Sequence, residues 1–183
     1  MLEKKELERL VSGAKRMDTD ALAELCACFY PQVYRFMLTR VPTREDAEDL
    51  AGEVCVRAVE SLSKQRGFFP AWLYRIARNM VTDFYRRRRV RDRVESGYDE
   101  KKTGSVADPF NSNESILIEK DLEQAMDHLT PEQQEVIHLR FIEGYSTTEI
   151  AEIQGKSPGA IRALQFRAIE TLRNLMASPT GGK

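Results

Sequence analysis

The chain has 183 residues, of which 42% are hydrophobic and 31% are charged, and its formal net charge is −1. This composition is typical of a globular protein rather than a disordered one. The length allows one ordinary domain or two small ones. The charge is unevenly distributed, because Lys and Arg outnumber Asp and Glu by ten to two over residues 63–93, with acidic segments on both sides. This basic band predicts a polyanionic partner for that part of the chain.

Two further features limit the class of protein. No apolar run approaches the roughly 20 residues that span a bilayer, and the charged N-terminal sequence MLEKKELERL lacks the apolar stretch of a signal peptide. We therefore expect a cytoplasmic protein without membrane insertion. The cysteines are odd in number and have no ligand spacing with either histidine, so we expect reduced cysteines, no metal and no cofactor. They are Cys26, Cys28 and Cys55.

The hydrophobic periodicity is helical throughout and predicts an all-α fold. We expect helices over residues 3–15, 21–41, 44–62 and 70–89, with Pro31 kinking or splitting the second and Thr43 capping the third. Residues 93–113 lose the periodicity and contain Gly, Pro and Ser, which indicates a flexible linker. The sequence thus predicts two small helical domains, residues 1–92 and 114–183.

The helix predicted over residues 70–89 carries the basic band. Its apolar stripe contains Phe69, Leu73, Ile76, Ala77, Met80 and Phe84. The spacing places a second set on the opposite face: Trp72, Arg75, Asn79, Asp83 and Arg86, followed by further arginines up to Arg89. An aromatic ring beside guanidinium and amide groups favours contact with phosphates and unstacked bases. The alternative is an ordinary basic face with a partly buried tryptophan.

The C-terminal part predicts a helix-turn-helix. Capping boxes begin helices at Thr130 and Ser146, Gly155 provides a turn, and Ser157 begins the last helix. In such a motif the N-terminal residues of the second helix face base edges in the major groove. Here these residues are Ser157, Gly159, Ala160, Arg162, Ala163, Gln165, Phe166 and Arg167. An ordinary helical hairpin with a solvated face is the alternative.

Four segments together resemble one family. The run Phe69–Asn79 and its continuation to Arg87 resemble the melting and minus-ten segment of extracytoplasmic-function (ECF) sigma factors. Residues 45–54 resemble their polymerase-clamp helix, and residues 129–134 and 155–162 resemble their minus-thirty-five domain. The segments occur in the family's order. The chain departs from the usual family pattern at Gly52, at Cys55 and at Leu164-Gln165-Phe166.

The resemblance implies a sigma factor that binds core RNA polymerase, recognises promoter DNA and initiates transcription of a specific gene set. The acidic residues Asp46, Glu48, Asp49 and Glu53 would bind the clamp of the largest polymerase subunit. The loop 64–69 and the basic helix, including Arg87, would hold the unpaired minus-ten strand. Members of the family are commonly held inactive by an anti-sigma factor, which makes such a protein a candidate partner.

Two other classes of function compete with this interpretation. A stand-alone helix-turn-helix regulator would explain the C-terminal half, but it leaves the acidic helix and the tryptophan-arginine face without a role. An enzyme would need a recognisable site, and the sequence has no P-loop, nucleophile elbow or metal-ligand cluster. We therefore do not expect an enzyme.

Overall fold

The chain divides into two units, residues 1–106 and residues 107–183. In a computed structural model, the residues described are 3–95, 125–126 and 128–177, and within these ranges there are helices and turns but no strand. The predicted all-α fold with two helical domains is confirmed. The predicted linker lies mostly outside the described residues, so the domain limits at residues 92 and 114 stay predictions.

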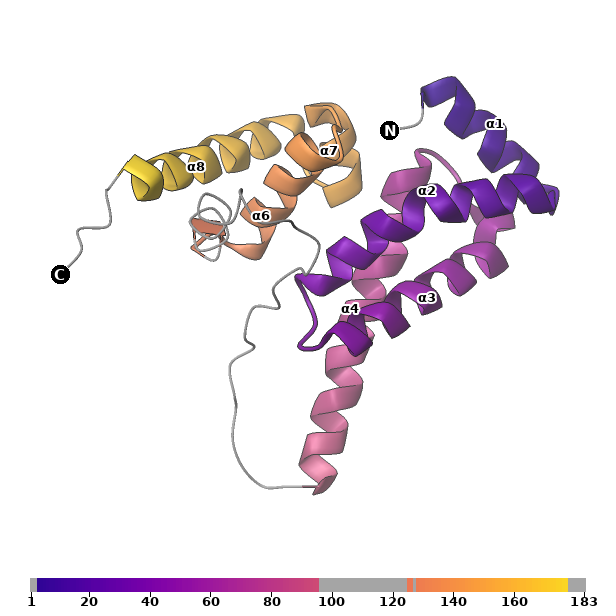
Figure 1. Cartoon of the computed structure of the whole chain (residues 1–183), viewed down its shortest axis with the longest axis horizontal. Helices are drawn as coiled ribbons and strands as arrows, with labels where there is room; N and C mark the ends of the chain where they lie inside the picture. The colour runs from indigo at the N-terminus through magenta and orange to yellow at the C-terminus, as the bar shows by residue number, and fades with distance from the viewer. Residues whose placement is uncertain (1–2, 96–124, 127, 178–183) are drawn as a thin grey trace, which may run out of the picture. The chain divides into compact units, whose positions relative to one another are not determined.

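The N-terminal unit is built around a long helix. Its elements are α1 (Lys4–Lys15), α2 (Thr19–Leu38), α3 (Arg44–Ser61), the 3-10 turn η1 (Leu62–Lys64) and α4 (Phe69–Glu95). Helix α2 packs against α1 and α3, and α3 packs against α4 (Figure 1). Helix α2 is continuous, so Pro31 does not split it as we considered. Pro31 is exposed, and water can therefore reach the carbonyl group that loses its helical hydrogen bond there.

The first half of α4 lies in the core of this unit. Phe69, Leu73, Ala77 and Met80 are buried as predicted, but Tyr74 is also buried, at 1% exposure. The Tyr74 ring packs edge-on against Phe36 of α2, with 5.3 Å between the ring centroids. Helix α4 is therefore buried on more than one face here, and a single apolar stripe underestimates its core.

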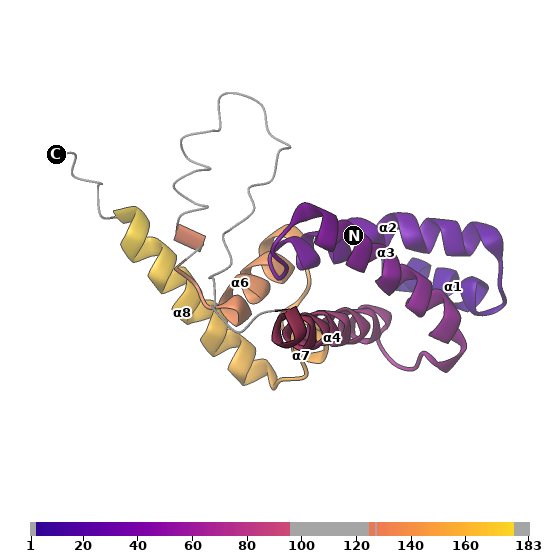
Figure 2. The ribbon, with the colours of Figure 1, turned by 90° about the horizontal axis from the view of Figure 1, so that it is seen from below.

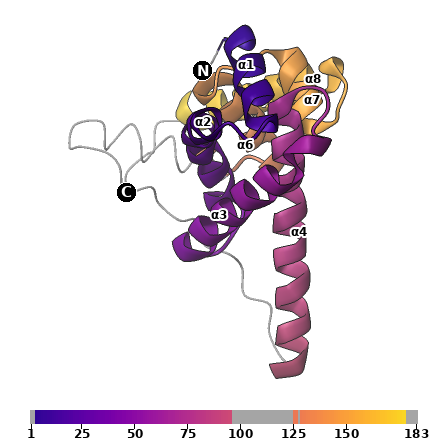
Figure 3. The ribbon, with the colours of Figure 1, turned by 90° about the vertical axis from the view of Figure 1, so that its right-hand side faces the viewer.

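The second half of α4 leaves the unit. Every described side chain from Arg86 to Val90 is exposed. Figures 1 and 3 show this end of α4 extending beyond α2 and α3. The helix continues to Glu95, past the predicted domain end at residue 92. The four arginines Arg86–Arg89 are thus exposed to solvent on the second half of α4.

The C-terminal unit has the predicted helix-turn-helix. Its elements are α6 (Pro131–Ile137), the π-helical turn η2 (His138–Ile142), α7 (Thr147–Gln154) and α8 (Pro158–Ala177). Helix α8 packs against both α6 and α7, and its C-terminal end reaches beyond them (Figure 2). Both predicted capping boxes are present, at Thr130 and at Ser146.

Two large apolar side chains of this unit are exposed. Phe141 is 59% exposed, because the π-helical turn shifts the register after the buried Leu139. Leu175 is 37% exposed, near the end of α8 that reaches beyond the other helices.

Candidate nucleic-acid interface

The basic face of α4 is largely where the sequence predicts it. Arg75, Asn79, Arg86 and Arg87 are exposed, and Asp83 is half-buried. The Asp83 carboxylate lies 3.1 Å from the Arg86 guanidinium, one helical turn away. This acid therefore orients one arginine of the face and partly neutralises it. A row of exposed guanidinium and amide groups can contact phosphates and base edges.

Trp72 does not belong to this exposed face. Its side chain is only 7% exposed, and its ring packs against Phe69 with 5.7 Å between the centroids. The predicted exposed position of Trp72 is wrong, and a partly buried tryptophan was the alternative that the sequence left open. In this conformation Trp72 stabilises the start of α4 and presents no face on which a base could stack.

The loop before α4 is held by hydrogen bonds that the sequence did not indicate. Lys15 of α1 donates from Nζ to the carbonyl of Gln65 at 2.9 Å, and the buried Gln65 donates from Nε2 to the carbonyl of Gly67 at 2.7 Å. Gly67 has a φ of 73°, a left-handed conformation that favours glycine. These contacts give the loop a defined conformation, while Lys64 and Arg66 stay exposed.

The acidic residues of α3 are accessible, but most of them have partners within the unit. Asp46 accepts a hydrogen bond from the Thr43 hydroxyl at 2.8 Å, and Thr43 caps the helix as predicted. Glu48 accepts one from Arg44 Nε at 3.0 Å, a bond that raises the pKa of Arg44. Asp49 and Glu53 are exposed. The face thus presents carboxylates on the side of α3 that is not packed into the core.

An aromatic pair lies beside this acidic face. Tyr30 and Tyr34 of α2 stack in nearly parallel planes, with 6.2 Å between the ring centroids. Burial raises the pKa of Tyr30, and the charge of Glu48 raises it further. Val56 of α3 is 58% exposed. The sequence analysis named none of these three residues, since the exposure of an aromatic or apolar side chain on a helix depends on how the helix packs.

The helix-turn-helix presents its second helix to solvent. Gly155 turns the chain with a φ of 65°, and the Ser157 hydroxyl accepts a hydrogen bond from the Ala160 amide at 3.2 Å, which begins α8. Ile161 is fully buried and anchors α8 to its unit. The predicted DNA-facing residues lie on the other faces: Ser157, Gly159, Ala160, Arg162 and Arg167 are exposed, and Gln165 is half-buried.

Phe166 adds an apolar group to this face, because it is 68% exposed between Gln165 and Arg167.

No group of three or more His, Cys, Asp or Glu side chains that could hold a metal occurs in the described part of the chain. Among the described helices, none is both long and apolar enough to cross a bilayer. The recognisable surfaces of the two units are therefore charged, polar and aromatic helix faces.

Comparison with known proteins supplies the family. Residues 25–91 match Sigma-70 region 2, and residues 125–174 match Sigma-70 region 4. The ECF RNA polymerase sigma factor BldN of Streptomyces coelicolor is 36% identical over 91% of this chain, which spans 64% of its length. CarQ of Myxococcus xanthus, an RNA polymerase sigma factor, is 33% identical over 93% of this chain and 95% of its own. The ECF sigma factor SigD of Mycobacterium tuberculosis is 31% identical over 92% of this chain and 82% of its own.

Solved structures show the same fold. CnrH, in complex with the cytosolic domain of CnrY, superposes with a TM-score of 0.68 at 22% identity, over 96% of this chain and 99% of that one. RpoE of Bartonella quintana, in complex with the anti-sigma factor NepR, gives a TM-score of 0.62 at 24% identity, over 86% and 97%. The chain therefore belongs to the ECF sigma factors, the subunits with which RNA polymerase recognises promoters and initiates transcription.

Proposed function

We propose that the chain divides the work of a sigma factor among three helices. Helix α3 binds core RNA polymerase through Asp46, Glu48, Asp49 and Glu53. Helix α4 holds the minus-ten DNA, and α8 reads the minus-thirty-five element. The observation that supports this division is the match to regions 2 and 4 in a single chain, with charged and polar side chains exposed on each of the three helices.

The minus-ten contacts are assigned to the exposed face of α4. Arginine and asparagine side chains can hold phosphates and the edges of unpaired bases. The residues proposed are Arg75, Asn79, Asp83, Arg86 and Arg87. Trp72 was predicted to join them, but its ring is buried, so a contact with DNA would require the side chain to leave its packing against Phe69.

The minus-thirty-five contacts are assigned to the N-terminal half of α8. Its first turn is small and polar, which lets the helix approach base edges closely, and Arg162 lies one turn further on. The residues proposed are Ser157, Gly159, Ala160, Arg162, Gln165 and Arg167. The proposed contacts divide into base readout by Arg162 and phosphate contact by Arg167.

Run-off transcription tests the proposed function. Purified core polymerase, which alone does not select promoters, is incubated with the chain and a promoter library. Transcripts that begin downstream of one shared pair of sequence elements are the expected result. Transcription that stays as unselective as with core alone contradicts the proposal.

A charge-reversal experiment tests the role of α3. We expect Asp49→Arg combined with Glu53→Arg to weaken binding to core polymerase, because both carboxylates are exposed and the fold does not depend on them. The matched control is Glu3→Arg with Glu8→Arg, which reverses two exposed acids outside the proposed face. Equal affinities of both variants for core would remove the polymerase-binding role of α3.

Two further assignments follow from the family. We propose that the chain acts in the cytoplasm, where core polymerase and promoter DNA are found, and that it is a regulator without catalytic activity of its own. We also propose an anti-sigma factor as a partner. It would be recognised experimentally as a protein that binds the chain and prevents its association with core polymerase.

A further inference from the structure

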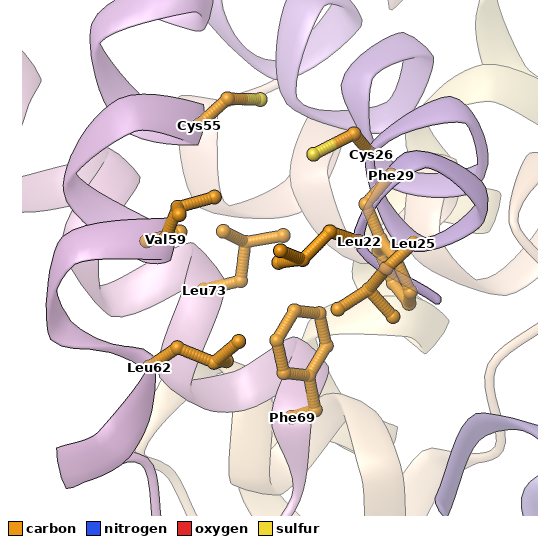
Figure 4. Close-up of a pocket in the computed structure, with 10 residues that line it drawn as sticks. Leu22, Leu25, Cys26, Phe29, Cys55, Val59, Leu62, Phe69 and Leu73 are labelled. Carbon is orange, nitrogen blue, oxygen red and sulfur yellow. The ribbon is translucent and has the colours of Figure 1, made fainter. Parts of the chain in front are cut away.

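Two cysteines lie on opposite walls of a small cavity in the N-terminal unit. The cavity is formed between α2, α3 and the start of α4, and its lining is aliphatic and aromatic apart from Cys26 of α2 and Cys55 of α3. Figure 4 shows the two side chains pointing toward one another across the cavity, with no other side chain drawn between the sulfur atoms. Two thiols from different helices therefore share one space.

The electrostatics agree with this arrangement. Burial, and then the neighbouring Cys26, raises the pKa of Cys55 to about 11, so each thiol lies within electrostatic reach of the other. Burial also raises the pKa of Cys26. Both cysteines are free and half-buried.

The donor set selects the kind of ligand. A structural zinc ion takes four protein ligands, whereas no group of three or more ligating side chains is found in the described part of the chain. Apart from the two sulfur atoms, the lining offers no donor side chain. Soft thiolate ligands select soft cations such as Cu(I). Two sulfur atoms that face each other can complete the coordination of such an ion if the ion is two-coordinate and nearly linear.

We propose that Cys26 and Cys55 form a two-coordinate site for a soft, monovalent cation of the Cu(I) class. Binding replaces the two S–H bonds by two sulfur–metal bonds and releases two protons, and no atom changes its oxidation state. The bound ion joins α2 to α3 and so stabilises the N-terminal unit. This site is independent of the proposed role in transcription.

A disulfide between the same cysteines fits these observations less well. Its formation needs a two-electron oxidant. A cation that binds both sulfur atoms needs no oxidant.

Cys28 provides a matched control. It lies on α2, two residues after Cys26, and a step of two residues rotates a side chain by about 200° around a helix. Cys28 is free and half-buried like the other two, but it does not line the cavity. Its removal therefore deletes a thiol of the same helix and leaves the proposed site intact.

The experiment titrates the full reduced chain with Cu(I), delivered from a competing chelator without oxygen or added thiols. Native mass spectrometry gives the number of ions per monomer, and competition with the chelator gives the affinity. The variants are Cys26→Ser, Cys55→Ser and Cys28→Ser, each checked for its helical content and its thermal midpoint before copper is added. Cys26→Ala and Cys55→Ala replace any serine variant that fails to fold.

We expect one ion per monomer and a higher thermal midpoint in the wild type and in Cys28→Ser. Loss of outer-shell partners alone costs about 10–100-fold in metal affinity, so removal of either ligand is expected to weaken binding at least that much. The proposal is overturned if Cys28→Ser weakens binding equally, if a variant lacking Cys26 or Cys55 keeps the wild-type affinity, or if copper binds only by linking two chains.

Discussion

Arg87 of α4 faces Glu53 of α3, with Nη2 of the arginine 4.0 Å from Oε2 of the glutamate. The pair therefore joins a side chain proposed to hold DNA to one proposed to hold polymerase. The two side chains are 57% and 50% exposed, and an exposed ion pair contributes about 0–1 kcal/mol. Polymerase would bind Glu53 and so release Arg87 from this ion pair. Binding of polymerase should therefore raise the affinity of α4 for DNA by a modest factor.

This coupling can be measured on the free protein. We expect Glu53→Gln to raise the affinity for a single-stranded minus-ten oligonucleotide by up to about fivefold, the equivalent of roughly 1 kcal/mol. The increase should disappear when Arg87 is already replaced by alanine. Fluorescence anisotropy at fixed salt gives the four affinities of the double-mutant cycle.

The control for this cycle is Glu48→Gln. Glu48 lies on the same helix, but its carboxylate pairs with Arg44 of α3 and not with α4. The substitution removes the same charge without freeing Arg87. An equal gain in both variants would mean that general charge, and not the Arg87–Glu53 pair, limits DNA binding.

Substitution of the two arginines of α8 should affect DNA binding in different ways. If the Arg162 guanidinium binds a guanine, we expect Arg162→Ala to weaken binding by about 1–3 kcal/mol. The preference for one base at that promoter position should also be lost. Arg167→Ala should weaken binding to all sequences. It should also reduce the slope of log affinity against log salt concentration by about one, because one phosphate contact is lost. Binding of the holoenzyme to promoter variants at several salt concentrations separates the two. Unchanged affinity and preference in Arg162→Ala would show that this helix is not the reader.

The helix boundaries could be predicted because they depend on local chemistry. Thr43, Thr130, Ser146 and Ser157 each accept a hydrogen bond from a backbone amide in the first turn of their helix, as their sequence positions indicate. Gly155 adopts the left-handed conformation that ends α7. Such interactions involve only a few neighbouring residues, so the pattern of the sequence contains them.

The errors concern burial, which depends on the rest of the fold. Trp72 and Tyr74 are buried because more than one helix covers the first half of α4. The hydrophobic pattern of α4 itself does not show which helices pack against it. The apolar run Phe68-Phe69-Pro70-Ala71-Trp72-Leu73-Tyr74 was the available signal, since a helix that is apolar all round is usually buried. Phe141 is exposed because a π-helical turn changes the register, which the periodicity could not indicate.

The raised pKa of Cys55 predicts an unusual pH profile of alkylation. Burial, and then the neighbouring Cys26, raises this pKa from 9.0 to about 11. Since the thiolate is the reactive form, the rate should rise about tenfold per pH unit from pH 8 to pH 10 without levelling off. Peptide mass spectrometry after timed iodoacetamide labelling measures the rate at Cys55.

The reference for this profile is the chain unfolded in urea, in which burial is lost. There the rate should level off near the ordinary pKa of 9.0. A folded-state profile that levels off at the same pH as the unfolded one would show that Cys55 is not held in an apolar environment.

The last prediction concerns the dependence on polymerase. We expect the isolated chain to bind promoter duplex weakly and to gain tight, specific binding only with core enzyme. The net charge is −1, and Arg86 and Arg87 already face Asp83 and Glu53, which weakens the attraction of the free protein for phosphates. The two proposed readers also lie in separate units, so simultaneous binding carries an ordering cost unless a scaffold fixes their spacing.

A stand-alone helix-turn-helix regulator predicts the reverse, namely tight and specific duplex binding without a partner. Anisotropy titrations of the same promoter duplex with and without core polymerase distinguish the two, at one near-physiological salt concentration because phosphate contacts make affinity steeply salt-dependent. A shuffled duplex of equal length is the control for specificity. Nanomolar specific binding by the chain alone, unchanged when core is added, would contradict a sigma-factor mechanism. Such a result would assign DNA recognition to the α7–α8 motif acting without polymerase.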